Sequence, residues 1–249
     1  MSTVPLPRRV REIRYPTTDG KPMAETDLHR RLMTELIASL QAFYAAEPMV
    51  YVSGNLLLFY EQGNRRRHLA PDVFVVRGVG KHERENYLMW EEGQPPRFVI
   101  ELTSSSTRRN DTGRKFELYR DVLKVREYFM FDPYEDYLEP SMQGWRLRGG
   151  VYHPIRAVDG RLPSQTTGLH LERDGRELRL WNPATKERLL LPVQAEQRSR
   201  LQAQARADQS QARADEAKAR ADEAEARAAR AEAELRRLRE RFGLPGDVS

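Results

Sequence analysis

The chain has 249 residues, of which 39% are hydrophobic and 32% are charged, and its formal net charge is +5. This composition is too polar for all residues to share one core, and the lack of cysteine excludes disulfides, thiolate metal sites and cysteine nucleophiles. We expect a soluble, cytoplasmic protein, because no apolar run reaches the roughly 18 residues of a membrane span and the first residues lack a signal-peptide core.

Much of the charge lies near the C-terminal end. Residues 193–249 hold 12 Lys and Arg against 11 Asp and Glu, which leaves 30 against 26, a net charge of +4, in residues 1–192. So mild an excess is compatible with a polyanionic partner but does not demonstrate one. The sequence divides into a lead-in (1–22), a folded domain (23–192), a helix (193–242) and a tail (243–249).

A helix and three strands are the first predicted elements. From residue 24 onward, leucines recur every four residues, which predicts an amphipathic helix. Residues 49–60 indicate a strand or bent strand, residues 63–68 a hairpin turn, and residues 69–76 a second strand that is buried on both faces. After a loop, residues 97–103 indicate the third strand.

A second helix and a fourth strand follow. A polar turn with an N-cap at Asn110 or Asp111 predicts a helix through about Leu123, and residues 126–133 predict a strand that ends at Asp-Pro. Later hairpin-like segments extend or cover the sheet. Since parallel strands need a crossover connection, the order helix, three strands, helix, strand implies an α/β fold with a mixed sheet.

Beyond Pro192 the apolar spacing changes to a seven-residue repeat. Positions step by three and four over residues 214–242, which predicts a left-handed coiled coil. The alternative is a single solvated helix held by alanine propensity and Glu/Arg pairs. A homodimer through this segment would be weak, because alanine buries little area. Most of its affinity would come from Leu235, Leu238 and Phe242.

Two carboxylates occupy unusual positions. Glu101 lies inside an apolar strand, where an ionised carboxylate is costly unless a cation or donors meet it. Such costs are typical of functional sites. Asp72 follows Pro71 at the start of another strand. If the strands are neighbours, roughly 4.8 Å apart, both carboxylates can bind one Mg²⁺ or Mn²⁺. Alternatively, Asp72 caps a turn and Glu101 pairs with an arginine of residues 65–67.

Three further side chains are candidates by position. Glu25 and His29 extend the buried face of the first helix toward the sheet, although Glu25 could simply favour the helix dipole and His29 could be a core histidine. Lys115 could form a surface ion pair with Asp111, four residues earlier. A short turn before its helix would instead place the ammonium beside Glu101, where it could stabilise a pentacoordinate phosphate or orient water.

The segments around these residues resemble the Uma-two family of restriction endonucleases, a branch of the PD-(D/E)XK nuclease superfamily. The likeness covers about residues 16–185 and is carried by PMAETDLH, APDVFVV, FVIELTSSSTRRNDTGRKFELY and VREYFMFDP. It implies a restriction-endonuclease-like αβββαβ core with a divalent cation at the edge of the sheet. The C-terminal coiled coil lies outside that core.

The resemblance also implies a site. Pro71 and Asp72 match the PD motif, and Glu101 matches the acid of (D/E)XK. The lysine of that motif would stand at position 103, where this chain has Thr103. In the family resembled the lysine is moved onto the following helix, and Lys115 is the matching position.

We therefore predict a Mg²⁺-dependent (or Mn²⁺-dependent) endonuclease that hydrolyses phosphodiester bonds in DNA. Asp72 and Glu101 would bind the metal, Lys115 would be the electrostatic partner, and Glu25, tuned by His29, an auxiliary acid. Contacts to the DNA backbone would come from a set of arginines that is equally compatible with a solvated surface: Arg65, Arg66, Arg67, Arg108 and Arg109. The alternative is a noncatalytic module with a nuclease fold that binds or assembles through its coiled coil.

Overall fold

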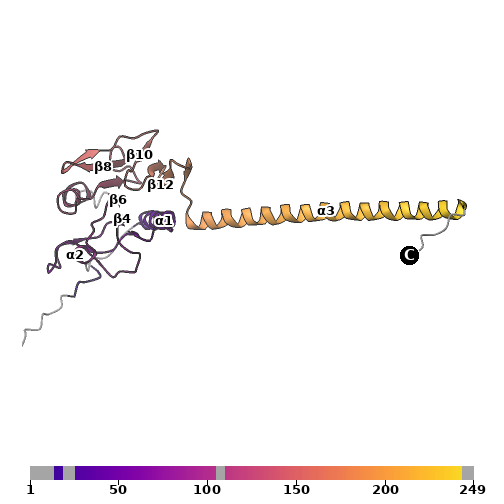
Figure 1. Cartoon of the computed structure of the whole chain (residues 1–249). Helices are drawn as coiled ribbons and strands as arrows, with labels where there is room; N and C mark the ends of the chain where they lie inside the picture. The colour runs from indigo at the N-terminus through magenta and orange to yellow at the C-terminus, as the bar shows by residue number, and fades with distance from the viewer. Residues whose placement is uncertain (1–13, 19–25, 105–109, 243–249) are drawn as a thin grey trace, which may run out of the picture. The chain divides into compact units, whose positions relative to one another are not determined.

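The computed structural model describes residues 14–18, 26–104 and 110–242. Three predicted site residues, Glu25, Arg108 and Arg109, lie outside the described residues. The chain divides into two compact units, Met1–Pro192 and Val193–Ser249, and some of their elements are labelled in Figure 1. Of the helices within the described ranges, none combines the length and apolar character needed to cross a membrane.

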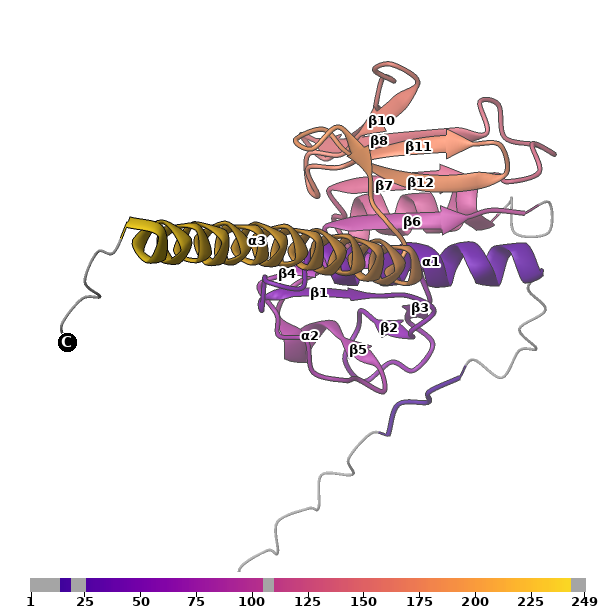
Figure 2. The same ribbon diagram turned by 90° about the vertical axis from the view of Figure 1, so that its right-hand side faces the viewer.

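A six-stranded mixed sheet forms the centre of the first unit. β6 and β7 are parallel neighbours and lie side by side in Figure 2, whereas the other neighbouring pairs are antiparallel. The predicted order of helix, three strands, crossover and strand in a mixed sheet is confirmed. In sheet order the strands are β1 (Val50–Ser53), β4 (Val73–Arg77), β6 (Phe98–Leu102), β7 (Glu127–Phe131), β8 (Met142–Arg148) and β9 (Val151–Pro154).

Two smaller sheets flank the central one. Residues 49–60, predicted as one strand or bent strand, contribute to two different sheets, because the chain leaves β1 at Gly54 and continues as β2. The three-stranded sheet contains β2 (Leu58–Phe59), β3 (His68–Leu69) and β5 (Tyr87–Leu88), with helix α2 (Met89–Glu92) directly after β5. The four-stranded sheet contains β10 (Arg161–Pro163), β11 (His170–Asp174), β12 (Glu177–Asn182) and β13 (Glu187–Arg188).

Helix α1 (Asp27–Phe43) packs against the central sheet. Its N-cap is Thr26, whose hydroxyl accepts a hydrogen bond from the backbone N–H of His29 at 3.2 Å. Leu32, Leu36 and Leu40 of its predicted apolar face are buried in the same hydrophobic cluster as residues of β4, β6 and β7, and the partly buried Leu28 packs against that cluster. The helix contacts β1, β4, β6 and β12, and Figure 2 shows it beginning at the side toward which β6 points.

The crossover between β6 and β7 differs from the prediction. The sequence predicts an α-helix over about residues 110–123, but the structure forms two π-helical segments, η1 (Asn110–Lys115) and η2 (Leu118–Val122). Hydrogen bonds in a π-helix join residues five apart, and such turns are frequent at functional sites. Lys115 at the end of η1 and Tyr119 in η2 both contact the buried carboxylate of Glu101.

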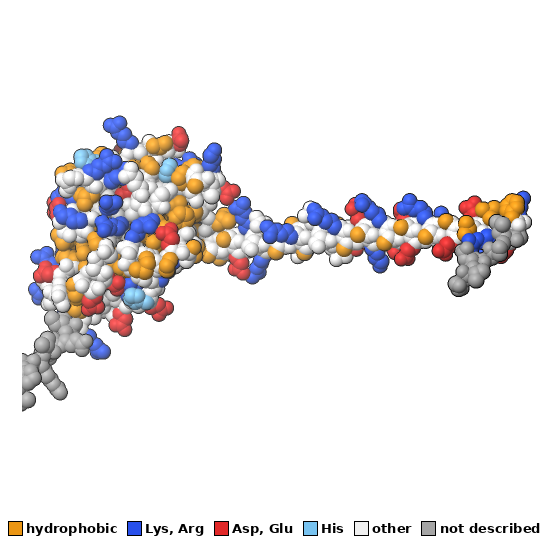
Figure 3. Space-filling view, in the orientation of Figure 1, with side chains coloured by type: hydrophobic (Ala, Val, Ile, Leu, Met, Phe, Trp, Pro, Cys, Tyr) orange, Lys and Arg blue, Asp and Glu red, His pale blue; other side chains and the backbone are white. Residues whose placement is uncertain are grey.

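The long helix predicted at the C-terminal end is present as α3 (Pro192–Phe242). None of its residues is buried within the described chain. Charged side chains of both signs are distributed along it in Figure 3, and its ion pairs at a spacing of four residues include Arg200 with Glu196 and Arg220 with Glu216. Such exposed pairs contribute only about 0.3 to 0.5 kcal/mol each.

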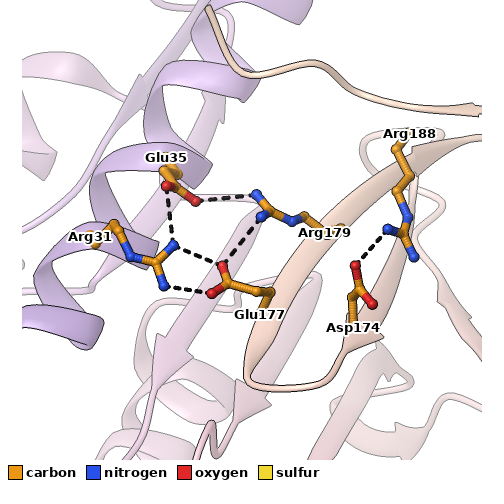
Figure 4. A network of polar contacts seen from close by, with 6 residues as sticks. All are labelled: Arg31, Glu35, Asp174, Glu177, Arg179 and Arg188. Carbon is orange, nitrogen blue, oxygen red and sulfur yellow. Dashed lines mark hydrogen bonds and ion pairs between the residues drawn. The ribbon is translucent and has the colours of Figure 1, made fainter. Parts of the chain in front are cut away.

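A network of ion pairs joins α1 to the four-stranded sheet (Figure 4). Arg31 of α1 contacts Glu177 of β12 at 2.5 Å, and Arg179 of β12 contacts Glu35 of α1 at 3.2 Å. Further contacts within the network join Arg31 with Glu35 and Arg179 with Glu177. Because two carboxylates and two guanidiniums share four contacts, the network fixes the helix against this sheet better than one surface pair would.

Glu127 anchors the four-stranded sheet to β7. It is 1% exposed and accepts hydrogen bonds from Arg146 Nε at 2.7 Å and Ser164 Oγ at 2.6 Å. The backbone N–H groups of Gln165 and Thr166 donate at 2.9 Å each. Burial alone would raise the pKa of Glu127, but the bonds from Ser164, the two backbone groups and Arg146 outweigh it and lower the pKa.

Replacing Glu127 with Gln should destabilise the fold by about 2 to 4 kcal/mol near neutral pH, because an amide presents its NH₂ group to donors. The lowered pKa means that the carboxylate stabilises the fold above its unfolded-state pKa and loses that effect as pH falls through its folded-state pKa. Denaturant unfolding should therefore show a gap between wild type and Glu127→Gln that narrows in acid. The exposed control Glu83→Gln should match wild type throughout; a pH-independent gap would contradict the prediction.

Candidate functional site

Two carboxylates meet where β4 and β6 pair. Val73 lies opposite Ile100 in this antiparallel pair, so Asp72 falls opposite Glu101 in the same register. The backbone N–H of Leu102 donates a hydrogen bond to Asp72 Oδ2 at 2.7 Å. The structure thus brings the two residues together, as expected for acidic residues on neighbouring strands.

Glu101 is 1% exposed, and donors meet both of its oxygens. Lys115 Nζ donates to Oε2 at 2.9 Å, and the hydroxyl of Tyr119 donates to Oε1 at 2.5 Å. The alternative that Glu101 pairs with an arginine of residues 65–67 is wrong. Tyr119 is not among the site residues predicted from the sequence; its spacing of four residues from Lys115 is the signal that places both on one side.

Lys115 bridges two carboxylates. Its ammonium contacts Glu101 Oε2 at 2.9 Å and Asp111 Oδ1 at 3.2 Å. The predicted pair with Asp111 therefore exists, but it is buried rather than on the surface, since Asp111 is 1% exposed. Lys115 therefore contacts Asp111 and Glu101 together, as its position in the crossover after β6 allows.

His29 contacts Asp72 from the first turn of α1. Its Nε2 lies 3.3 Å from Asp72 Oδ1, and both side chains are mostly buried. The sequence suggested that His29 acts on Glu25, which is outside the described ranges. Among the described residues His29 contacts Asp72, and the N-cap at Thr26 fixes the helical turn from which the imidazole reaches it.

The pKa values of the site's three ionisable groups, Asp72, Glu101 and Lys115, are shifted in different ways. Burial would raise the pKa of Asp72, but the hydrogen bond from His29 and the charge of Lys115 lower it. Burial raises the pKa of Glu101 to about 8, although Lys115 opposes the shift. Burial disfavours the ammonium of Lys115, yet the surrounding carboxylates, Glu101 first, keep its pKa above the ordinary value. Two acids with pKa values pushed apart are typical of sites that handle protons.

Thr103 lies on the same strand face as Glu101, at the position where the (D/E)XK motif has its lysine. Its Oγ1 is buried and has no hydrogen-bond partner within the described ranges. A buried hydroxyl without a partner costs about 1 to 3 kcal/mol. The position therefore faces the site and offers a donor that the described chain does not use.

The donor set fits a hard divalent cation. No group of three or more His, Asp or Glu side chains that could hold a metal ion occurs in the described part of the chain. Mg²⁺, however, is commonly bound by one or two carboxylates together with water and a phosphate oxygen. Each donor described above uses one lone pair of a carboxylate oxygen of Asp72 or Glu101, and each oxygen has two.

The predicted arginines lie elsewhere. Arg65, Arg66 and Arg67 are exposed in the turn between β2 and β3, where Arg67 pairs with Glu61 at 3.4 Å. In the contacts among described residues, none of the three touches Asp72 or Glu101. The structure therefore does not join this run to the buried acids.

Comparisons with known proteins identify one family. The Uma2 model, described as "Putative restriction endonuclease", matches residues 5–174, which is more than half of the chain. A solved structure of "a putative nuclease belonging to DUF820" from Anabaena variabilis ATCC 29413 is similar at 17% sequence identity with a TM-score of 0.43. That match covers 63% of this chain and 85% of the other. The comparison with curated proteins finds no match.

Replacing Gly54 with Ala should disturb the position of Asp72. The added Cβ would lie 1.9 Å from the carbonyl oxygen of Asp72 and 2.7 Å from Ile37 Cδ1, so backbone must move. We expect a loss of about 1 to 3 kcal/mol in the free energy of unfolding. Thermal unfolding measures it, with Gly80→Ala as the control, whose Cβ would meet its nearest atom at 3.7 Å. Equal midpoints for the two variants would refute the close approach.

Proposed function

The chain belongs to the Uma2 family, and from that premise we propose that it is a Mg²⁺-dependent or Mn²⁺-dependent endonuclease that hydrolyses phosphodiester bonds in DNA. Membership supports the nuclease class as such. We infer the metal requirement from the chemistry of the site, and the DNA substrate from the restriction endonuclease class that the family's description names.

One observation carries the proposal, the burial of Asp72 and Glu101 opposite each other with Lys115 beside them. A buried ionisable cluster is expensive, and an apolar replacement is often equally or more stable. A buried cluster of ionisable side chains is therefore more typical of a reaction site than of a structural core. Asp72 and Glu101 would hold the cation, which when bound would polarise the scissile phosphate.

The remaining groups have roles that follow from their contacts. Lys115 would stabilise negative charge that develops on the phosphate, because its ammonium already stays protonated between carboxylates. Tyr119 holds Glu101, and His29 orients Asp72.

Thr103 Oγ1 would donate a hydrogen bond at the position where the (D/E)XK motif has its lysine. Glu25 would act as an auxiliary acid.

Contacts with the DNA backbone would come from the exposed arginines of the β2–β3 turn, together with Arg108 and Arg109. Guanidinium groups match phosphate geometry, and such contacts strengthen binding at low salt without reading sequence.

The nuclease proposal is tested by incubating plasmid and single-stranded DNA with the full chain and Mg²⁺ or Mn²⁺. Asp72→Ala, Glu101→Ala and Lys115→Ala should each lower the cleavage rate at least about a hundredfold, since each removes a proposed metal ligand or the ammonium beside it from the reacting centre. Arg156→Ala, which changes an exposed arginine, should cleave like wild type. Cleavage that survives all three substitutions, or is absent with every metal, would exclude the proposed enzyme.

We also propose that α3 pairs with a second copy of itself over residues 214–242. Leu235, Leu238 and Phe242 are 51%, 45% and 66% exposed within the chain, at the spacing of a coiled-coil seam. A second helix would bury them, whereas a solitary helix would leave them in water. The rest of the seam is alanine, so affinity would be low.

Sedimentation of the full chain should therefore show a concentration-dependent dimer. Leu235→Ser combined with Leu238→Ser should shift it to monomer, because the largest apolar side chains of the seam are removed. Leu201→Ser, which changes an exposed leucine outside residues 214–242, should not. A monomer at all concentrations for wild type would show that the helix stands alone.

A further inference from the structure

A second polar site lies at the other end of the central sheet. A cavity of about 730 Å³ opens there and is lined mainly by arginines, with one acidic side chain, Glu127. Its volume is within the range of about 300 to 1,000 Å³ that is typical of small-ligand sites. Its lining contains the guanidinium-bearing residues Arg77, Arg97, Arg126, Arg146 and Arg148.

Four neighbouring strands supply these arginines. Arg77 is the last residue of β4, Arg97 and Arg126 directly precede β6 and β7, and β8 carries Arg146 and Arg148. Since adjacent strands lie roughly 4.8 Å apart, the sheet presents the arginines as a row. Figure 3 shows Lys and Arg side chains gathered over the sheet on the face in view.

The backbone under the row is fixed by hydrogen bonds. Arg97 N donates to Val75 O at 2.9 Å, and Arg97 O accepts from Glu127 N at 3.0 Å. Arg126 O accepts from Leu147 N at 2.8 Å. The stems of the guanidinium groups therefore start from rigid strand ends, which lowers the entropy lost when a ligand binds.

Two of the arginines have acidic partners, and three do not. Arg146 pairs with Glu127 at 2.7 Å, and Arg77 pairs with Glu47 at 3.2 Å. No carboxylate of the described residues lies within ion-pair distance of the other three, Arg97, Arg126 and Arg148. Like charges held together without counter-charge repel, so an anionic ligand is the group that would relieve them.

We propose that this cavity, the arginine cavity, binds a compact oligophosphate, a ligand with two or more linked phosphoryl groups. Guanidinium groups bind phosphate oxygens in bidentate fashion. The three arginines without an acidic partner come from three different strand ends, with neighbouring strands roughly 4.8 Å apart, so linked phosphoryl groups can contact more of the row at once than a single phosphate can. The walls also offer Gln165 and Thr166 as polar partners. The inference does not depend on the proposed nuclease activity.

The arginine cavity is separate from the buried acids. Asp72 precedes β4 and Arg77 ends it, while Arg97 precedes β6 and Glu101 lies near its end. Four residues along β6, at roughly 3.3 Å each, put the two sites on the order of 13 Å apart. A ligand in the cavity would therefore not occupy the acid site.

The test is calorimetric titration of the full chain with inorganic triphosphate, pyrophosphate and orthophosphate, without divalent cations. Triphosphate should bind at least tenfold more tightly than orthophosphate at matched ionic strength. Arg126→Gln combined with Arg148→Gln should weaken triphosphate binding at least tenfold, and both side chains are exposed, so the fold should tolerate the change. A matched double variant, Arg156→Gln with Lys186→Gln, removes the same charge elsewhere and should bind within twofold of wild type.

Several results would overturn the proposal. These are equal weakening by both double variants, orthophosphate binding as tight as triphosphate binding, or no heat with any of the three anions. A single-stranded oligonucleotide provides the last arm: if it binds through Arg126 and Arg148 while triphosphate does not, the face contacts nucleic acid and the oligophosphate site is wrong. Unchanged unfolding midpoints without ligand would confirm that the Arg126 and Arg148 variant remains folded.

Discussion

The pairing of β4 with β6 is the constraint on which the candidate site depends. It sets Asp72 opposite Glu101 and uses the backbone of Leu102 to hold the aspartate. Hydrogen-bond donors and positive charge must then come from outside the sheet, because burying a carboxylate without them costs free energy. The crossover supplies Lys115 and Tyr119, and α1 supplies His29. Three side chains from the crossover and α1 thus meet the two carboxylates of one strand pair.

The buried ion pair between Glu101 and Lys115 is weak evidence for stability and stronger evidence for a functional role. Desolvation of Glu101 and Lys115 offsets much of their attraction, and apolar side chains of similar volume often pack there at no loss. The clusters on both faces of the sheet already provide an extensive apolar core. Glu101 is thus a costly exception within an otherwise apolar strand, which is how sites that favour chemistry over stability differ from the surrounding core.

Local pattern predicted some of this arrangement and could not have predicted the rest. Strand alternation correctly separates Glu101 from its neighbour Ile100, which belongs to the cluster on the α1 side. The contact between His29 and Asp72 depends on how a helix lies on a sheet, which periodicity does not specify. Tyr119 has an apolar ring on an apolar face, so only the fold shows that its hydroxyl meets a carboxylate. The π-helical winding is likewise not predicted, because helix propensity and apolar spacing do not separate it from the ordinary helix.

Antiparallel pairing also explains why opposite charges gather at opposite ends of the same strands. The start of β4 lies beside the end of β6, and Asp72 and Glu101 meet there. At the opposite end of the same two strands, the end of β4 lies beside the start of β6, and Arg77 and Arg97 line the arginine cavity. A net charge of +4 over residues 1–192 looks diffuse when it is counted along the sequence. In the fold, part of it is a local concentration of guanidinium groups, so the electrostatic field near that edge is stronger than the net charge alone suggests.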